Sequence, residues 1–152
     1  LILITFLPFL ELRASIPYGI IILKMSWLTV FMVCVITNII LAPLLWIFVN
    51  YMMHLFLYIK PIEKVYNKVI LKTQKRVHPY VEKYGTLGLA LFIGIPLPGS
   101  GVYSGALGAY LLGFRFRDYL IASIIGVLIA GMIVSIVSIT GAGAFSFFLK
   151  GI

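Results

Sequence analysis

The chain has 152 residues, of which 62% are hydrophobic and 11% are charged, with a formal net charge of +8. Soluble domains average about 25% charged residues, so this composition excludes an ordinary soluble domain and indicates an integral membrane protein. The positive charge does not indicate a nucleic-acid-binding protein, because most of it lies in one segment between apolar stretches. Cys34 is the single cysteine, which excludes a disulfide framework within the chain.

The first segment, residues 1–24, is apolar but is interrupted by two prolines and two charges. Pro8 and Pro17 each lack a backbone donor and clash with the preceding helical turn, and we include Pro17 in the candidate site. Glu11 and Arg13 stand between them, where a membrane segment would carry apolar side chains. We therefore predict a re-entrant helical hairpin, which enters the membrane, breaks and returns to the same side.

The two charges of this hairpin are the strongest candidates for a functional site. An ionised group at the bilayer centre costs at least about 2.5–3.5 kcal/mol, so each needs a partner or water. Glu11 is a candidate site for a proton or a cation. Arg13 is a candidate clamp for an anion or a phosphate group, because its planar guanidinium donates two parallel hydrogen bonds. The alternatives are an interfacial position or a purely structural ion pair.

A long apolar segment, residues 27–59, is predicted to cross the membrane. At about 1.5 Å per residue it exceeds a hydrocarbon core of about 30 Å, so we expect a kink at Pro43 and an end that projects into the cytoplasm. Residues 60–83 follow as the predicted cytoplasmic connector, because basic loops beside membrane spans mark that side. Its seven basic residues are Lys60, Lys64, Lys68, Lys72, Lys75, Arg76 and Lys83. Contact with anionic headgroups is compatible with this placement.

The second hairpin is predicted at residues 84–113 and contains the most strongly broken stretch of the chain. The residues of this break that we assign to a site are Pro96, Pro98, Gly99, Ser100 and Gly101. Two prolines so close together stop a helix, and the glycines open backbone angles that other residues avoid. Broken backbone in hydrocarbon needs protein or water around its N–H and C=O groups, so this stretch is predicted to line a site.

Ser100 lies between two glycines, which raises the question of an intramembrane hydrolase. A serine nucleophile needs a general base, and the two histidines lie late in the long span (His54) and in the connector (His78). We therefore predict no enzyme and interpret the glycine-flanked serine as part of a backbone cradle for an anion, or as a hinge. The sequence has no metal-ligand cluster and no Walker pattern, so no cofactor is expected.

Three charged residues follow the second hairpin, namely Arg115, Arg117 and Asp118. We interpret them as an interfacial turn, within residues 114–119, on the cytoplasmic side. The alternative is a patch that binds lipid headgroups at the mouth of the second hairpin.

The last apolar segment, residues 120–140, is predicted to cross the membrane, and residues 141–152 form a tail without an assigned structure. Gly126, Ala130 and Gly131 in this span are small enough to permit close helix packing.

The two predicted hairpins and the two predicted membrane-crossing segments indicate the fold class. We expect an all-α integral membrane protein of one domain, with two inverted repeats, each a re-entrant helical hairpin plus a transmembrane helix. A shift of 88 residues takes Pro8 to Pro96 and Ala42 to Ala130, a weak internal repeat in agreement with this plan.

The two broken motifs also resemble those of a known family. The stretches Glu11-Leu12-Arg13-Ala14-Ser15-Ile16-Pro17 and Ile95-Pro96-Leu97-Pro98-Gly99-Ser100-Gly101 resemble motifs of the family named putative small multi-drug export proteins. That family is similar in plan to the DedA, or VTT-domain, membrane proteins. The resemblance implies two opposed re-entrant hairpins and the movement of lipids, including polyprenyl-phosphate carriers, across a bilayer.

The functional prediction is a transporter or flippase for an amphipathic, anionic lipid, such as a polyprenyl phosphate or a phospholipid. Membrane lipids are the expected partners, and coupling to protons or sodium ions, as well as a homo-oligomer, are compatible with the prediction. Two other hypotheses stay open: a small multidrug exporter of amphipathic cations, and a scaffold that transports nothing. A water-accessible cavity around Glu11 and Arg13 would favour transport, and a dry, packed tip region would favour the scaffold.

Overall fold

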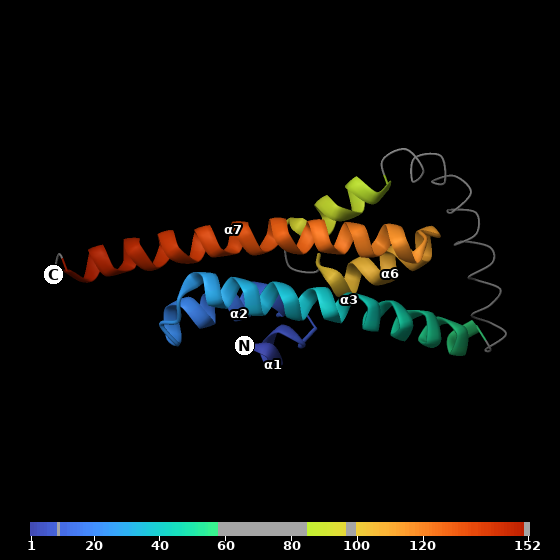
Figure 1. The fold of residues 1–152 in the computed structure, drawn as a ribbon, viewed down its shortest axis with the longest axis horizontal. Coiled ribbons are helices and arrows are strands. Elements are labelled where there is room, and N and C mark those ends of the chain that lie inside the picture. The colour runs from blue at the N-terminus through green and yellow to red at the C-terminus, as the bar shows by residue number, and fades with distance from the viewer. Residues whose placement is uncertain (9, 58–84, 97–99, 151–152) are drawn as a thin grey trace.

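The regular elements of the described residues are all helical in the computed structural model (Figure 1). The structure describes residues 1–8, 10–57, 85–96 and 100–150, with the backbone alone described at residues 56–57 and from residue 142 onward. In chain order the helices are α1 (Ile2–Thr5), α2 (Glu11–Pro17), the π-helix η1 (Tyr18–Ile22), α3 (Trp27–Leu57), a helix at residues 85–94, α6 (Val102–Leu112) and α7 (Phe116–Lys150).

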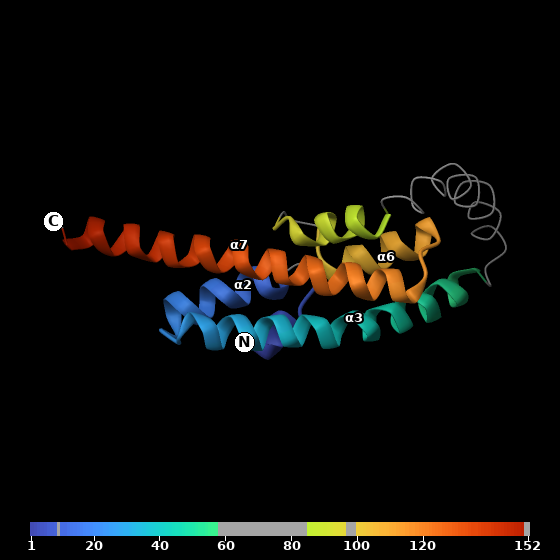
Figure 2. The same ribbon diagram turned by 45° about the horizontal axis from the view of Figure 1, so that its top comes forward.

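Helices α3 and α7 form the frame of the molecule and run antiparallel along its length (Figures 1 and 2). They contain 31 and 35 residues, and each includes a stretch long and apolar enough to cross a membrane, Trp27–Leu55 and Phe116–Gly141. The prediction of two long apolar helices is confirmed. Pro43 lies inside α3, which continues through it to Leu57.

The outward faces of α3 and α7 carry large apolar side chains. On α3, Ile47 and Phe48 are about three-fifths exposed, and on α7 so are Met132, Ile136 and Val137. Water would make such a continuous apolar surface unfavourable, whereas hydrocarbon would not. These faces therefore suit a lipid environment.

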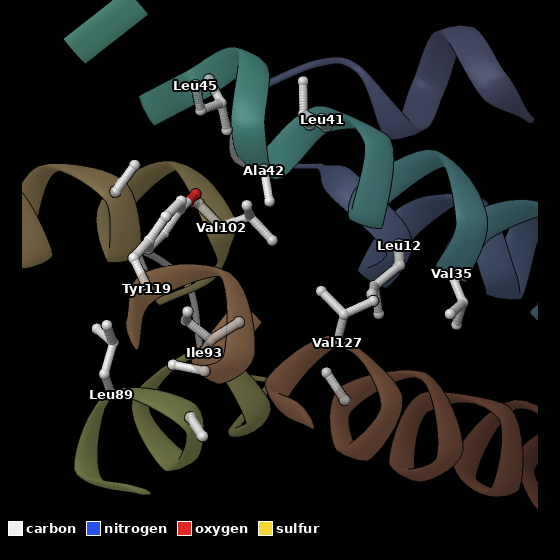
Figure 3. Packing of buried hydrophobic residues seen from close by; sticks show 14 of the residues in the cluster. Leu12, Val35, Leu41, Ala42, Leu45, Leu89, Ile93, Val102, Tyr119 and Val127 are labelled. Carbon is white, nitrogen blue, oxygen red and sulfur yellow. The ribbon is translucent and has the colours of Figure 1, made fainter. Parts of the chain in front are cut away.

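The core lies where the short helices fit between the two long ones (Figure 3). Leu12 of α2 lies near Val127 of α7, and Val102 of α6 lies beside Ala42 and Tyr119. All of these side chains are almost completely buried. The shorter helices therefore join α3 to α7 through a continuous apolar cluster.

Two glycines of α7 allow this close packing. A Cβ on Gly126 would lie 2.7 Å from the carbonyl oxygen of Ala90, and one on Gly131 would lie 2.9 Å from the ring of Phe31. The prediction that small residues of this span permit close helix packing is confirmed for both positions.

The first broken segment differs from the prediction in the role of Pro17. The chain turns at residues 6–8 and 10, and α2 then runs through Pro17 and continues directly into η1. Pro17 has no N–H for the preceding turn, and the π-helical geometry restores backbone bonding beyond it, with Leu23 N–H donating to Tyr18 O at 3.1 Å. The prediction that Pro17 interrupts the helix is therefore wrong.

The second segment has the predicted order of helix, break and helix. A helix at residues 85–94 is followed by the break and then by α6, which ends at the left-handed Gly113 (φ +77°). Pro98 and Gly99 lie outside the described residues, as does the predicted connector at residues 60–83 with His78.

The start and end of α7 also differ from the prediction. The helix begins at Phe116, so Arg117 and Asp118 belong to its first turn instead of a separate charged turn. At the other end, it runs without interruption to Lys150, through most of the predicted tail. Its apolar sequence, with few β-branched residues after Thr140, is compatible with continued helix.

The two broken segments lie at opposite ends of the frame. Helices α1, α2 and η1 accompany the first half of α3, whereas residues 85–94 and α6 accompany the first half of α7 (Figures 1 and 2). Because α3 and α7 are antiparallel, the two breaks meet near the middle of the bundle.

Candidate functional site

The first turn of α2 contacts the break that precedes α6, although the two are some ninety residues apart in the chain. We call this contact region the junction. It consists of Glu11, Arg13, Ser100, Gly101, Val102 and Tyr103. The junction brings together predicted site residues from both hairpins.

Glu11 directs its carboxylate at the N-terminus of α6. The carboxylate accepts hydrogen bonds from the backbone N–H groups of Val102 at 3.4 Å and Tyr103 at 3.3 Å. These are among the amides that a helix leaves without an internal partner, and the helix dipole favours a negative charge there. Glu11 is only 4% exposed, so its main partners are these amides and its neighbours in the junction.

Gly101 makes room for this carboxylate. Its φ of +134° lies in a region that side chains other than glycine rarely adopt. A Cβ at this position would lie 2.5 Å from Glu11 Oε2, closer than any ordinary contact. Glycine is therefore required at position 101 both by the backbone and by the packing.

The backbone of Glu11 is itself strained. Its φ of +43° is unusual for a residue other than glycine, and such conformations cost on the order of 1–3 kcal/mol. The surrounding contacts, including the bond from Glu11 N–H to Leu7 O at 3.2 Å, hold it in place.

Arg13 spans the break of the second hairpin. Its guanidinium donates to the carbonyl oxygen of Ser100, to Ser100 Oγ at 2.8 Å and to the carbonyl oxygen of Ile95 at 3.3 Å. Ser100 Oγ donates in turn to Ile95 O at 2.6 Å. The prolines of this break cannot supply N–H donors to the carbonyls, so the arginine provides them. Arg13 is half-buried.

Two tyrosines that sequence reasoning missed complete the junction. The hydroxyl of Tyr103 donates to the carbonyl oxygen of Phe6, in the first break. The hydroxyl of the fully buried Tyr119 donates to Val102 O at 3.3 Å, and its ring stacks on Trp46 at a centroid distance of 5.2 Å. A buried tyrosine needs a partner for its hydroxyl, but the sequence does not show that Tyr119 is buried, and Tyr103 is only half-buried, so no sequence signal indicated these residues.

The remaining predicted site residues occupy other places. Arg115 and Arg117 are exposed at the start of α7, and Asp118 is half-buried there. They follow the C-terminal end of α6, whose 11 residues span about 16 Å at the rise of an α-helix, whereas the junction lies at its N-terminal end. Pro17 lies one helical turn beyond Arg13, and Pro96 is half-buried next to Ile95. The charges at the start of α7 therefore form a separate group.

Among the residues that the structure describes, no group of three or more His, Cys, Asp or Glu side chains could hold a metal ion.

Fold and junction together define a class of protein. Two long apolar helices expose apolar faces, while two broken segments bury charged side chains between them, as in helical membrane proteins that handle a substrate inside the bilayer.

The family follows from a comparison with known proteins. The model of the family described as putative small multi-drug export protein matches residues 11–133, from Glu11 of the junction to the middle of α7, and the chain belongs to this family. Neither the curated proteins nor the solved structures provide a match to the chain. The chain is thus a membrane protein of an exporter family, a class that moves substrates and ordinarily does not convert them.

Proposed function

We propose that this protein moves an amphipathic, anionic lipid across the membrane and binds the lipid headgroup at the junction. The observation that carries the proposal is the contact of Arg13, from one broken segment, with the backbone of the other. An arginine in the interior of an apolar bundle marks a substrate or ion pathway by default, because its burial is costly. The export description of the family supports transport as the activity.

The donors of the junction suit a phosphate group. The Arg13 guanidinium, the Ser100 hydroxyl and the first amides of α6 are hydrogen-bond donors gathered in one place. A phosphate headgroup presents only acceptor oxygens near neutral pH, so these donors are complementary to it. A polyprenyl phosphate or an anionic phospholipid combines such a headgroup with chains that the apolar outer faces of α3 and α7 accommodate.

The arrangement of the helices supports a two-fold plan in the membrane. In this proposal each half of the chain is a re-entrant hairpin plus a membrane-crossing helix, in opposite orientations, as in the DedA proteins. The protein is then multi-pass, with residues 60–83 in the cytoplasm. Cysteine labelling from outside intact cells at Lys24→Cys and Lys68→Cys tests the topology, and equal access to both positions would contradict it.

A second candidate is the export of amphipathic cations. The family description names multidrug export, and the buried carboxylate of Glu11 could bind a cation. The same carboxylate is the candidate for coupling to protons or sodium ions, and Glu11→Gln should then alter the pH or sodium dependence of transport.

Reconstitution into proteoliposomes separates these functions. The assay compares the movement of a labelled polyprenyl phosphate, a labelled phosphatidylglycerol, a labelled phosphatidylcholine and a cationic dye. We expect movement of the anionic lipids, a clear loss for Arg13→Lys, since an ammonium cannot reproduce the bidentate fork, and a larger loss for Arg13→Ala.

The outcomes of this assay are distinct. Movement of the dye alone would support the cation exporter. Full lipid movement by a folded Arg13→Ala protein would eliminate the arginine clamp. No movement of any substrate by the folded parent protein would favour a scaffold.

A further inference from the structure

The carboxylate of Glu11 occupies the donors that the proposed function assigns to the substrate. It accepts hydrogen bonds from the amides of Val102 and Tyr103, and Arg13 follows two residues later on the same helix. Both a carboxylate and a phosphate are oxyanions, and both suit the N-terminus of a helix. Two such groups would repel each other in this small space, so the donors can serve only one at a time.

We propose that Glu11 is a tethered competitor for the anionic headgroup: its carboxylate occupies the start of α6 in this structure, and the headgroup binds there in its place. The inference rests on the proposed function, because it concerns the same junction and the same substrate class. It adds an autoinhibitory contact that regulates access to Arg13 and to the amides of α6.

The space for this exchange lies in front of Gly101. Both carboxylate oxygens of Glu11 lie within 2.7 Å of where a Cβ of residue 101 would be. When the Glu11 side chain turns away, it therefore uncovers a place bordered by the amides of Val102 and Tyr103. A phosphate oxygen can approach these amides because position 101 carries no side chain.

The strained backbone at Glu11 favours a reversible contact between its carboxylate and the start of α6. Among the described residues, Glu11 and Lys24 alone have a positive φ without being glycine. Lys24 closes the turn between η1 and α3, where Met25 N–H donates to Gly19 O at 3.1 Å, an ordinary helix end. Glu11 instead opens α2 directly after a turn, where its N–H donates to Leu7 O at 3.2 Å.

The carboxylate bonds are among the contacts that hold this strained backbone, so its relaxation after their release would offset part of the hydrogen bonding that is lost. Those hydrogen bonds, at 3.3 and 3.4 Å, are also longer than the usual 2.7–3.2 Å range of such bonds. A competing oxyanion thus needs only a moderate affinity to displace Glu11.

Binding can be followed through Trp46. The chain has two tryptophans, so a Trp27→Phe background leaves Trp46 as the only one. Trp46 stacks on Tyr119, whose hydroxyl donates to Val102 O, and its emission therefore reports on the start of α6. The probes are a short-chain phosphatidic acid, inorganic phosphate and, as a neutral-headgroup control, a short-chain phosphatidylcholine.

Removing the competitor should tighten binding. We expect Glu11→Ala to bind the phosphatidic acid at least about tenfold more tightly than the parent, because the site is no longer occupied in most molecules. Arg13→Ala in the same protein should abolish the gain. Gly108→Ala, in the open middle of α6, is the matched control and should leave binding unchanged. A similar gain for inorganic phosphate would identify free phosphate, instead of a lipid, as the source of the oxyanion.

The alternative outcomes are decisive. If Glu11→Ala does not fold, Glu11→Gln keeps the size of the side chain without its charge and should still bind several-fold more tightly. An unchanged or weaker affinity of a folded Glu11 variant for the phosphatidic acid overturns the hypothesis that Glu11 is a competitor. If the parent moves anionic lipids despite that result, the competitor alone is wrong. If the folded parent and variants neither bind an anionic probe nor move an anionic lipid, the proposed function is wrong as well.

Discussion

The two breaks of this molecule satisfy each other with different chemistry. The first, around α2, supplies charged side chains, namely the carboxylate of Glu11 and the guanidinium of Arg13. The second, before α6, supplies backbone amides and carbonyls that prolines and glycines release from regular helix. Either break alone would bury unpaired groups in an apolar bundle, at several kcal/mol each. This difference means that each break supplies the partners that the other lacks, so the junction forms as one structural unit although its halves lie far apart in the sequence.

The largest expected effect comes from filling the space between the two breaks. Gly101→Ala would place a methyl group 2.5 Å from Glu11 Oε2 and impose a left-handed backbone on alanine. We expect a loss of roughly 3 kcal/mol, at the upper end of the cost of such strain. Thermal unfolding in detergent measures it.

Gly108→Ala is the control for that variant on the same helix. Nothing lies within 4 Å of its added Cβ, so the change should stabilise α6 by up to about 1 kcal/mol through helix propensity. Equal melting temperatures for the Gly101 and Gly108 variants would show that the contact between the breaks does not determine stability.

A smaller effect is expected from weakening the side-chain part of the arginine contact. Ser100→Ala removes the hydroxyl that accepts from Arg13 at 2.8 Å and donates to Ile95 O at 2.6 Å, while Arg13 keeps its contacts to the Ser100 and Ile95 carbonyls. The expected loss is about 2 kcal/mol, from one hydrogen bond to a charged group and one neutral hydrogen bond. Chemical denaturation in a detergent that supports refolding gives the value.

The double variant with Arg13→Ala sharpens this test. If Ser100 acts through Arg13, the two effects should not add, whereas independent effects would add within about 0.5 kcal/mol. Additive losses would therefore contradict the assigned contact.

Tyr119→Phe should have a still smaller effect, because it leaves the ring in the core. It removes the hydrogen bond to Val102 O but keeps the stack on Trp46. We expect a loss of about 1 kcal/mol. Thermal unfolding gives the value, and Trp46 emission should stay unchanged in the folded state. A shift of that emission would mean that the hydroxyl also positions the ring.

The smallest effect is expected at the charged corner outside the junction. Arg117→Ala changes an exposed side chain in the first turn of α7, which follows the C-terminal end of α6, whereas the junction lies at the N-terminal end of α6. Stability should change by no more than about 0.5 kcal/mol, and transport in proteoliposomes should fall far less than for Arg13→Ala. An equal loss of transport for both variants would restore the headgroup patch at this corner as part of the site.

The sequence by itself determined the class of the fold and the place of the second helix break. Apolar runs without charges predict α3 and α7, since only helices satisfy their own backbone in hydrocarbon. Pro96, Ser100 and Gly101 mark the second break, because proline stops a helix and glycine adopts backbone angles that other residues avoid. The charges of Glu11 and Arg13 in an apolar segment indicated that both need partners.

Only the tertiary structure decided which partners these charges have. Nothing in the sequence pairs Glu11 with the amides of α6 or Arg13 with the carbonyls of Ser100 and Ile95, because backbone groups are the same at every residue. Local rules also misjudged Pro17, since α2 runs through it and continues directly into a π-helix. Long-range packing brings two distant breaks together, and that contact places both charges and the strain at Glu11.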